Sequence, residues 1–242
     1  MSVLRGQLAA ITGASGCIGG AISAALAERS VRLVLMGRDS AKLQASAETL
    51  RPFTSSIEVC ACDLTNDQDV EQATDNIAAK YGRLDILVHC AGIIEHGPLA
   101  DTPVATLDRQ YAANVRGPLL LTQRLLPLLK KPRGQIVFVN SSAGLSARPN
   151  TGQFSATQHA FKALADALRD EVNGDGVRVA SIFPGRTATP RISNLHTKEG
   201  REFKPEVLLQ PEDVASVVTN CLYLPWTAEV TNISIRPMVK SY

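Results

Sequence analysis

Short runs of apolar residues alternate along the chain with longer segments in which apolar positions recur at helical spacing. The short runs are rich in β-branched side chains and predict seven strands, at residues 8–12, 31–36, 57–60, 86–89, 136–140, 177–183 and 230–235. Helical spacing between them predicts helices at residues 18–29, 67–81, 104–129 and 152–173, and one that Ser40 caps and that ends at residue 50. Because each crossover must return over the sheet, this alternation implies a parallel sheet covered on both faces.

No linker, repeat or low-complexity tract divides the sequence. We therefore predict a single α/β domain over residues 1–242, a doubly wound parallel sheet of about seven strands flanked by helices. Residues 186–210 differ in composition from the rest of the chain, because they are polar, contain Pro190 and Pro205 and show little apolar periodicity. A stretch of that length without strong structure is often functional, so we expect it to form a lid over a substrate.

Composition narrows the class of protein. The 242 residues are 45% hydrophobic and 20% charged, which excludes a disordered chain, a collagen-like repeat and a coiled coil. A net charge of +2 gives no broad field for nucleic acid or an anionic membrane, so we expect neither as a partner. Residues 1–6 lack the apolar core of a secretion signal, and the five scattered cysteines suit reduced thiols, so we expect a cytoplasmic protein.

A glycine-rich segment separates the first predicted strand from the first predicted helix. Residues 12–19 read Thr-Gly-Ala-Ser-Gly-Cys-Ile-Gly. Glycine allows a sharp turn and a close approach to a phosphate, and the amides and dipole at the helix N-terminus favour a pyrophosphate. The alternative is an ordinary glycine-rich turn. The position in the first βαβ unit favours dinucleotide binding, with candidate contacts at Gly13, Ser15, Gly16, Cys17, Ile18 and Gly19.

The residue after the second predicted strand indicates which dinucleotide would bind. An acidic residue there would accept hydrogen bonds from the ribose hydroxyls of NAD. This chain has Arg38 at that place, and a guanidinium pairs in bidentate fashion with a 2′-phosphate. The alternative is a solvated arginine at the start of a loop. The sequence favours NADP(H) as the cofactor.

Six segments are informative together, at residues 12–19, 62–64, 89–92, 113–115, 140–144 and 184–189. In their content and order they resemble the short-chain dehydrogenase/reductase family over nearly the whole chain. The resemblance implies a Rossmann-like fold, catalytic roles for Asn114 and Ser141, and a substrate cleft lined by residues 93–103 and 186–210. Beyond the glycine loop, it implies cofactor contacts from Asp63, Leu64, Ala91, Gly92, Pro184, Gly185, Thr187 and Thr189. It also implies a homodimer or homotetramer formed through the two long helices.

Three departures from the family pattern matter. Cys17 replaces the usual middle glycine, and His89 and Cys90 replace a pair of asparagines. The third departure affects the proton donor and its partner, a Tyr and a Lys four residues later. Phe154 stands in the tyrosine position and Gln158 in the lysine position.

The chemical loss at these two positions is specific. In the family the Tyr hydroxyl protonates the carbonyl oxygen, and the Lys lowers the tyrosine pKa and holds the nicotinamide ribose. Phe154 has no proton to give, whereas Gln158 can still hydrogen-bond a ribose hydroxyl. We therefore count both with the catalytic positions. Ser141, with Ser142 as its rival, could bind a substrate carbonyl. His159, Lys162 and Tyr111 are the substitute acids to consider, while His89 and His96 lack a third ligand, so we expect no metal.

Three functions fit these observations. The first is an NADP(H)-dependent oxidoreductase that acts on a carbonyl/alcohol pair of a small, partly apolar molecule, with an altered proton relay. The second is a catalytically inactive NADP(H)-binding protein that serves as a sensor or partner. The third is the same fold used for non-redox chemistry. The intact cofactor segments favour the first, and the joint change at Phe154 and Gln158 favours the second.

Overall fold

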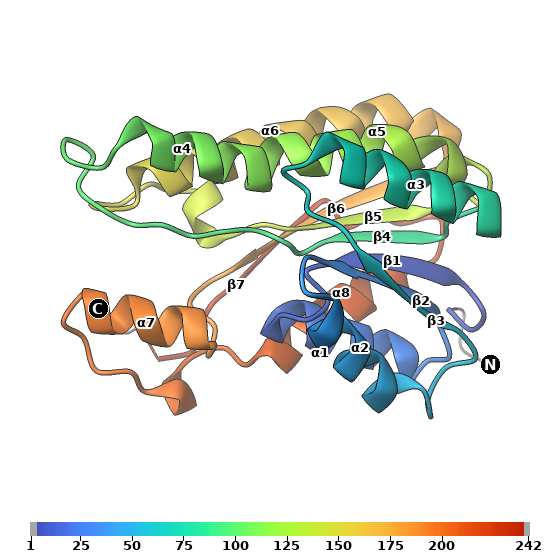
Figure 1. Cartoon of the computed structure of the whole chain (residues 1–242), viewed down its shortest axis with the longest axis horizontal. Helices are drawn as coiled ribbons and strands as arrows, with labels where there is room; N and C mark the ends of the chain where they lie inside the picture. Colours follow the sequence, from blue (N-terminus) through green and yellow to red (C-terminus); the bar gives the residue numbers. More distant parts are fainter. Residues whose placement is uncertain (1–3, 240–242) are drawn as a thin grey trace.

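A computed structural model describes residues 4–239. Its seven strands form one parallel sheet in the order β3-β2-β1-β4-β5-β6-β7 (Figure 1). The strands are β1 Leu8–Thr12, β2 Arg32–Gly37, β3 Ile57–Ala61, β4 Ile86–His89, β5 Gln135–Val139, β6 Arg178–Pro184 and β7 Asn232–Ile235. The order confirms the predicted doubly wound, Rossmann-like α/β fold. Because the direction of winding reverses between β1 and β4, a switch point opens at their carboxyl ends.

Helices cover both faces of the sheet, as Figure 1 shows. One face carries α1 Cys17–Ala27, α2 Ser40–Leu50 and α8 Pro211–Leu222. The other carries α3 Asp67–Tyr81, α4 Val104–Tyr111, α5 Gly117–Lys130 and α6 Gly152–Val172. A further helix, α7 Pro190–Lys198, lies beyond the carboxyl ends of the strands (Figure 1). None of the helices within residues 4–239 is long and apolar enough to cross a bilayer.

The core consists of two apolar clusters, one on each face of the sheet. Ala10 and Val34 belong to the cluster under α3, α5 and α6, whereas Ile11 and Leu35 belong to the cluster under α1, α2 and α8. Neighbouring residues of one strand therefore face opposite clusters. This explains why the strands read as continuous apolar runs instead of alternating ones.

Local details differ from the predictions. Asp39, not Ser40, caps α2, because its carboxylate accepts a hydrogen bond from the Lys42 amide at 3.0 Å. The helix predicted over residues 104–129 is interrupted by a π-helical turn, Ala112–Arg116. Strand bounds shift by one or two residues, as apolar runs do not mark ladder ends.

The segment 186–210 is more ordered than its polar composition predicted. It contains α7, which begins after Thr189, whose hydroxyl accepts a hydrogen bond from the Ile192 amide at 3.3 Å. Pro190 occupies the first turn, where a missing amide proton costs nothing. The two ends of the segment lie side by side. Thr187 and Leu209 form a parallel bridge, and the Ala188 amide donates to the Leu209 carbonyl at 2.7 Å.

Candidate active site

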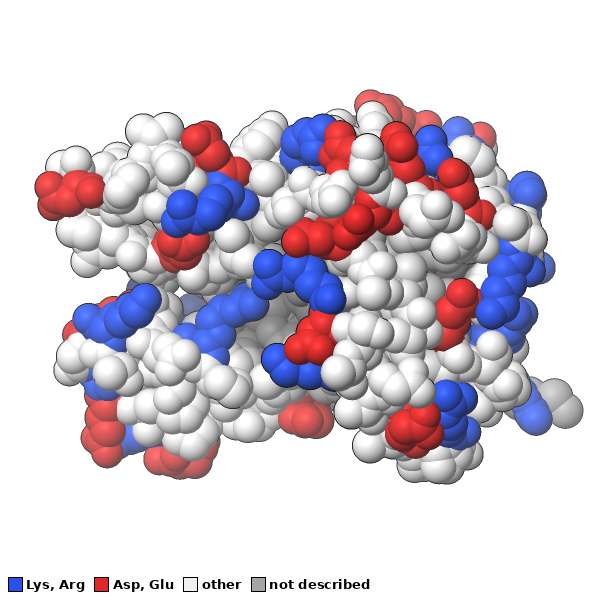
Figure 2. Space-filling view, in the orientation of Figure 1, with Lys and Arg blue, Asp and Glu red and all other residues white. Residues whose placement is uncertain are grey.

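The switch point and the segment 186–210 enclose the candidate site. Figure 2 shows a hollow in the molecular surface between the α4–α6 layer and α7, crossed by Lys and Arg side chains. The loops after β1, β4, β5 and β6 all end at this side of the sheet. The predicted site residues come from these loops, from the loops after β2 and β3, and from α1, the π-helical turn and α6.

The glycine loop is built for a close approach of another molecule. Gly13 has a φ of +68°, and a Cβ there would lie 2.9 Å from the Ala91 amide nitrogen. A Cβ on Gly19 would lie 2.2 Å from the Gly13 carbonyl oxygen, so only glycine lets α1 pack against the loop. Gly16 precedes α1 without any side-chain cap, and both Gly16 and Cys17 are exposed. The first amides of α1 are therefore free for an anion.

The end of β2 lies beside this loop. The Ala14 amide donates to the Met36 carbonyl at 3.2 Å, which ties the loop to the strand that leads to Arg38. Arg38 is exposed and has no ion-pair or hydrogen-bond partner among residues 4–239. Its guanidinium is available for a ligand phosphate.

A second arginine of this region was missed by the sequence analysis. Arg191 lies in the first turn of α7, near the thiols of Cys90 and Cys17 and the guanidinium of Arg38. Cys90 and Arg38 belong to the loops after β4 and β2, and Cys17 begins α1. The fold therefore brings Arg191 near the glycine loop and Arg38, a placement that no local sequence pattern could have indicated.

The remaining predicted cofactor residues in this region lie in the loops after β3 and β4. Asp63 is half-buried after β3 and accepts from the Thr65 amide and hydroxyl at 2.9 and 2.8 Å, and Leu64 is buried against Gly117. The Ala91 amide donates to the Thr12 hydroxyl at 3.1 Å. Gly92 lies so close to Asn114 that a Cβ there would be 3.1 Å from its carbonyl oxygen.

His89 and Cys90 have structural surroundings. His89 is buried, and its Nε2 lies 2.8 Å from the Thr122 hydroxyl, which itself donates to the Pro118 carbonyl. Because that hydroxyl proton is used, Nε2 must be the donor and Nδ1 has no partner among the described residues. Burial lowers the pKa of His89 to about 3 and raises the pKa of the Cys90 thiol to about 12. Both residues are therefore uncharged at neutral pH.

Asn114 lies in the π-helical turn, whose wider winding aims it at the loop after β4. Its carbonyl oxygen accepts from the Ile93 amide at 2.8 Å, and its amide donates to the Ile93 carbonyl at 2.9 Å and the Thr157 hydroxyl at 3.2 Å. The side chain thus holds this loop against α6. Its catalytic role stays a prediction.

Ser141 follows β5 and is half-buried, whereas its rival Ser142 is exposed. The Ser141 hydroxyl accepts from the Ala143 amide at 3.2 Å, and its own proton is free for a ligand. Asn140 fixes this turn to α6, since its amide donates to the Gln158 carbonyl at 3.1 Å and its oxygen accepts from the Ser141 amide at 2.7 Å. The sequence analysis did not single out Asn140.

Phe154 and Gln158 lie one turn apart on the buried face of α6. The ring of Phe154 packs beside the ring of His96, with centroids 5.8 Å apart. The Gln158 side chain has no hydrogen-bond partner among residues 4–239. Its amide is free to bind a ligand.

The substitute acids on and near α6 are elsewhere engaged. His159 is exposed and its Nδ1 lies 2.8 Å from the Ser155 carbonyl, in its own helix. Lys162 pairs with Asp166, one turn toward the C-terminus and away from Gln158. Side chains on a helix lean toward its N-terminus, which would bring Lys162 toward Gln158, but the Asp166 carboxylate attracts it the other way. Tyr111 is 49% exposed instead of packed in the core.

The segment after β6 leads directly into α7. Pro184 is buried at the end of β6, and the Gly185 amide donates to the Ile235 carbonyl at 2.8 Å. The buried Thr187 donates to the Gly185 carbonyl at 3.2 Å, and Thr189 caps α7. The chain is thus held where it passes the hollow.

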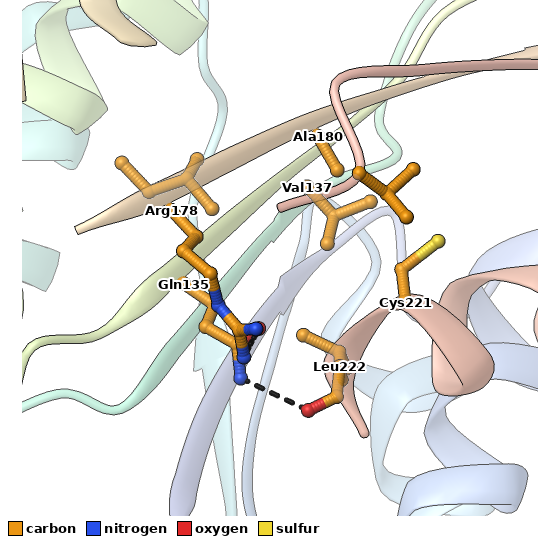
Figure 3. A pocket seen from close by; sticks show the side chains of 8 residues that line it. Gln135, Val137, Arg178, Ala180, Cys221 and Leu222 are labelled. Atoms are coloured by element: carbon orange, nitrogen blue, oxygen red, sulfur yellow. Dashed lines mark hydrogen bonds between the residues drawn. The ribbon is translucent and has the colours of Figure 1, made fainter. Parts of the chain in front are cut away.

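A second hollow lies at the other end of the sheet, where β5 and β6 begin (Figure 3). Its volume of about 10 Å³ suffices for one water molecule at most. Arg178 donates to the side-chain amide oxygen of Gln135 at 2.7 Å, and the side-chain amide nitrogen of Gln135 donates to the Leu222 backbone carbonyl at 3.2 Å. This hollow is too small for a nucleotide or a substrate. Within residues 4–239, no three His, Cys, Asp or Glu side chains are grouped to hold a metal ion.

Comparison with known proteins identifies the family of this chain. The family model described as short chain dehydrogenase matches residues 7–200. An uncharacterized oxidoreductase of Staphylococcus aureus strain USA300 is 30% identical over 239 residues, which cover 98% of this chain and 100% of that protein. An uncharacterized oxidoreductase of Staphylococcus saprophyticus is 29% identical over 240 residues, with the same coverage.

Solved structures of similar proteins support the same family assignment. An alcohol dehydrogenase from the archaeon Thermococcus sibiricus, complexed with 5-hydroxy-NADP, has a TM-score of 0.87 and 25% identity, covering 98% of this chain and 99% of that one. A metagenomic short-chain oxidoreductase in complex with NADP has a TM-score of 0.84 and 28% identity, covering 99% and 100%. This chain therefore belongs to the short chain dehydrogenase family of NAD(P)-binding oxidoreductases.

Proposed function

We propose that this protein is an NADP(H)-dependent oxidoreductase that interconverts a carbonyl and an alcohol on a small, partly apolar molecule. The observation that carries the proposal is the glycine loop with its uncapped helix next to an unpaired Arg38. The loop has room for a pyrophosphate only because Gly13 and Gly19 lack a Cβ, and Arg38 matches a 2′-phosphate. The solved relatives that carry NADP or 5-hydroxy-NADP support this choice.

Each residue of the site has a task in this proposal. Bound NADPH supplies the hydride. Asp63 and Leu64 would hold the adenine, and Gln158 would bind a ribose hydroxyl. Further cofactor contacts would come from Ala91, Gly92, Pro184, Gly185, Thr187 and Thr189. Ser141 would donate a hydrogen bond to the substrate oxygen, and residues 186–210 would exclude water as a lid.

The position of Phe154 separates this proposal from a second one. A buried phenylalanine and an uncharged Gln158 leave the family's Tyr and Lys roles unfilled. The second candidate is therefore an NADP(H)-binding protein without turnover. Both candidates need the same cofactor, so only chemistry distinguishes them.

The test is restoration of the missing pair. Phe154→Tyr combined with Gln158→Lys should raise NADPH-dependent reduction of aldehydes and ketones above the wild-type rate, because it supplies the general acid that the family uses and tunes its pKa. Phe154→Leu with Gln158→Met is the matched control and should give no increase. A flat rate of NADPH oxidation across the panel in the restored variant would contradict the oxidoreductase proposal.

A further inference from the structure

An imidazole lies beside the position that the family gives to its proton donor. His96 belongs to the loop after β4, and its ring centroid is 5.8 Å from that of Phe154, at an interplanar angle of 49°. The aromatic side chain of Phe154 is 5% exposed and cannot exchange a proton. His96 is thus the neighbouring group that can.

The loop that carries His96 is fixed on both sides of it. The Ile93 amide donates to Asn114 at 2.8 Å, the Glu95 amide donates to Gln110 at 3.1 Å, and the Gly97 amide donates to the Asn150 carbonyl at 2.8 Å. These bonds join the loop to α4, to the π-helical turn and to the residues before α6. A side chain on such a loop keeps its place relative to Phe154.

The two ring nitrogens of His96 differ in their surroundings. Nδ1 is enclosed, has no hydrogen bond, and lies 3.8 Å from a carboxylate oxygen of Glu199 at the end of α7. At 3.8 Å this contact is longer than a hydrogen bond, but a proton on Nδ1 would face the carboxylate and gain from its charge. Nε2 is the nitrogen left for a substrate, since it has no partner among residues 4–239.

Glu199 is itself held in place. Arg186 donates to it at 2.6 Å, and the Nε of Arg201 lies 3.4 Å from the same carboxylate oxygen. Burial opposes its charge, but Arg186, Arg201 and His96 together hold the pKa of this carboxyl below its usual range. An ionised carboxylate facing one nitrogen of a histidine fixes the tautomer and stabilises the imidazolium.

We propose that His96 is the general acid of this enzyme, with Nε2–H aimed at the substrate oxygen and Glu199 as the residue that positions the ring and favours its protonated form. The inference rests on the proposed oxidoreductase function. It makes Phe154 an apolar wall of the site and moves the proton-donating role from α6 to the loop after β4. Because Glu199 ends α7, the general acid is complete only while the segment 186–210 lies over the hollow.

The proton and electron balance is simple. The carbonyl carbon accepts a hydride, with its electron pair, and the nicotinamide is oxidised in the same step. The π electrons of the carbonyl move to oxygen, which takes the proton from Nε2 of His96. His96 passes from imidazolium to neutral imidazole beside Glu199, and solvent returns the proton after the alcohol leaves.

The pH dependence follows from the groups that face the ring. Burial lowers the pKa of His96 below its ordinary value of 6.5, Glu199 opposes this shift, and Arg186 adds to it. The acid form is needed for reduction. Carbonyl reduction should therefore be fastest below that pKa and should decline as pH rises through it, whereas alcohol oxidation should rise over the same range.

The first experiment needs neither cofactor nor substrate. An NMR titration of the imidazoles, with His96 assigned by loss of its signal in His96→Gln, measures its pKa in the wild type and in Glu199→Gln. The pairing predicts a lower His96 pKa in Glu199→Gln, and the pH midpoint of reduction should fall with it. An unchanged pKa would show that the carboxylate does not act on this ring and would overturn the pairing.

The second experiment measures ketone and aldehyde reduction. His96→Gln should lose about 10²- to 10⁴-fold in kcat/KM, while NADPH binding by calorimetry stays at the wild-type value. The control is His159→Gln, which should change neither kcat/KM nor NADPH binding. In the Phe154→Tyr/Gln158→Lys background, His96→Gln should cost little, because the restored tyrosine then supplies the proton.

Each other outcome has a definite meaning. Full activity in His96→Gln overturns the inference and leaves the oxidoreductase function intact. An inactive wild type whose Phe154→Tyr/Gln158→Lys variant is active would also overturn the inference about His96 and leave the oxidoreductase function intact. If both are inactive although NADPH binds, the proposed function fails and the role of His96 fails with it.

Discussion

His89 shows at the level of one residue how the central strand was adapted in this chain. The family usually has an asparagine at this place, and here a buried imidazole donates to Thr122 and packs against Phe138, with ring centroids 4.9 Å apart. The site can hold a neutral ring only. Its position beside the hollow therefore reflects packing, whereas the less buried His96 has a charged partner.

The buried His89 predicts a dependence of stability on pH. The unfolded chain binds a proton near pH 6.5, which the folded chain excludes until about pH 3. The free energy of unfolding should therefore fall as pH drops below 6.5, by at most about 1.4 kcal/mol per pH unit from this group. Urea titrations from pH 7.5 to 4.5 measure it. His89→Asn should flatten the slope and His159→Asn should not; equal slopes in wild type and His89→Asn would contradict the assignment.

Arg38 predicts cofactor choice. Arg38→Ala should weaken NADPH binding by about 10- to 100-fold, because a hydrogen bond to a charged group contributes roughly 1.5–3 kcal/mol. NADH lacks the 2′-phosphate, so its affinity should hardly change. Fluorescence titration with NADPH and with NADH measures the ratio of the two affinities. A parallel loss for both would mean that Arg38 supports the fold of the loop and does not bind the phosphate.

The junction of β1 and α1 is the element on which cofactor binding depends. Gly19→Ala places a Cβ 2.2 Å from the Gly13 carbonyl oxygen, and backbone must move to make room. We expect loss of nucleotide binding and a lower melting temperature. Gly20→Ala is the matched control, since its Cβ would lie at an ordinary 3.5 Å from the Ala14 oxygen and alanine favours a helix. Calorimetry and thermal melts compare the two; equal binding in both variants would contradict the tight junction.

The elements were predicted well where burial sets the pattern. Strands buried on both faces read as unbroken apolar runs, and α3 was bounded correctly because Asn66 caps it and Gly82, in the left-handed region, ends it. The order inside 186–210 was missed. Its helix depends on the Thr189 cap and Pro190, which are visible in the sequence, and on the Thr187–Leu209 bridge, which is not.

The candidate site was predictable only in part. Motifs that are local in sequence, such as the glycine loop and Arg38, identify their neighbourhood directly. The approach of His96 to Glu199 joins residues far apart in the chain, and it arises because the segment 186–210 folds back over the loop after β4. Arg191 was missed for the same reason. Their roles depend on tertiary contacts that no spacing in the sequence encodes.

For the whole molecule, the surface of α4 and α5 predicts assembly. Apolar side chains are unusually exposed there and on the preceding loop, with Val104 70%, Leu99 71% and Tyr111 49% exposed. The family resemblance implies a homodimer or homotetramer through the two long helices predicted at residues 104–129 and 152–173, the first of which contains α4 and α5, and such a patch suits an interface. Light scattering should give a dimer or tetramer, and Val104→Glu with Leu119→Glu should dissociate it. A monomeric wild type would contradict this prediction.

Calorimetric titration with NADPH and, separately, NADH would show whether this fold binds NADP(H). We expect tight binding of NADPH and weak binding of NADH, because the glycine loop would accept the pyrophosphate and Arg38 the 2′-phosphate. The remaining question would then be how a proton reaches the substrate beside Phe154. Absence of binding for both nucleotides would contradict the account and would make the chain a scaffold that no longer uses its cofactor site.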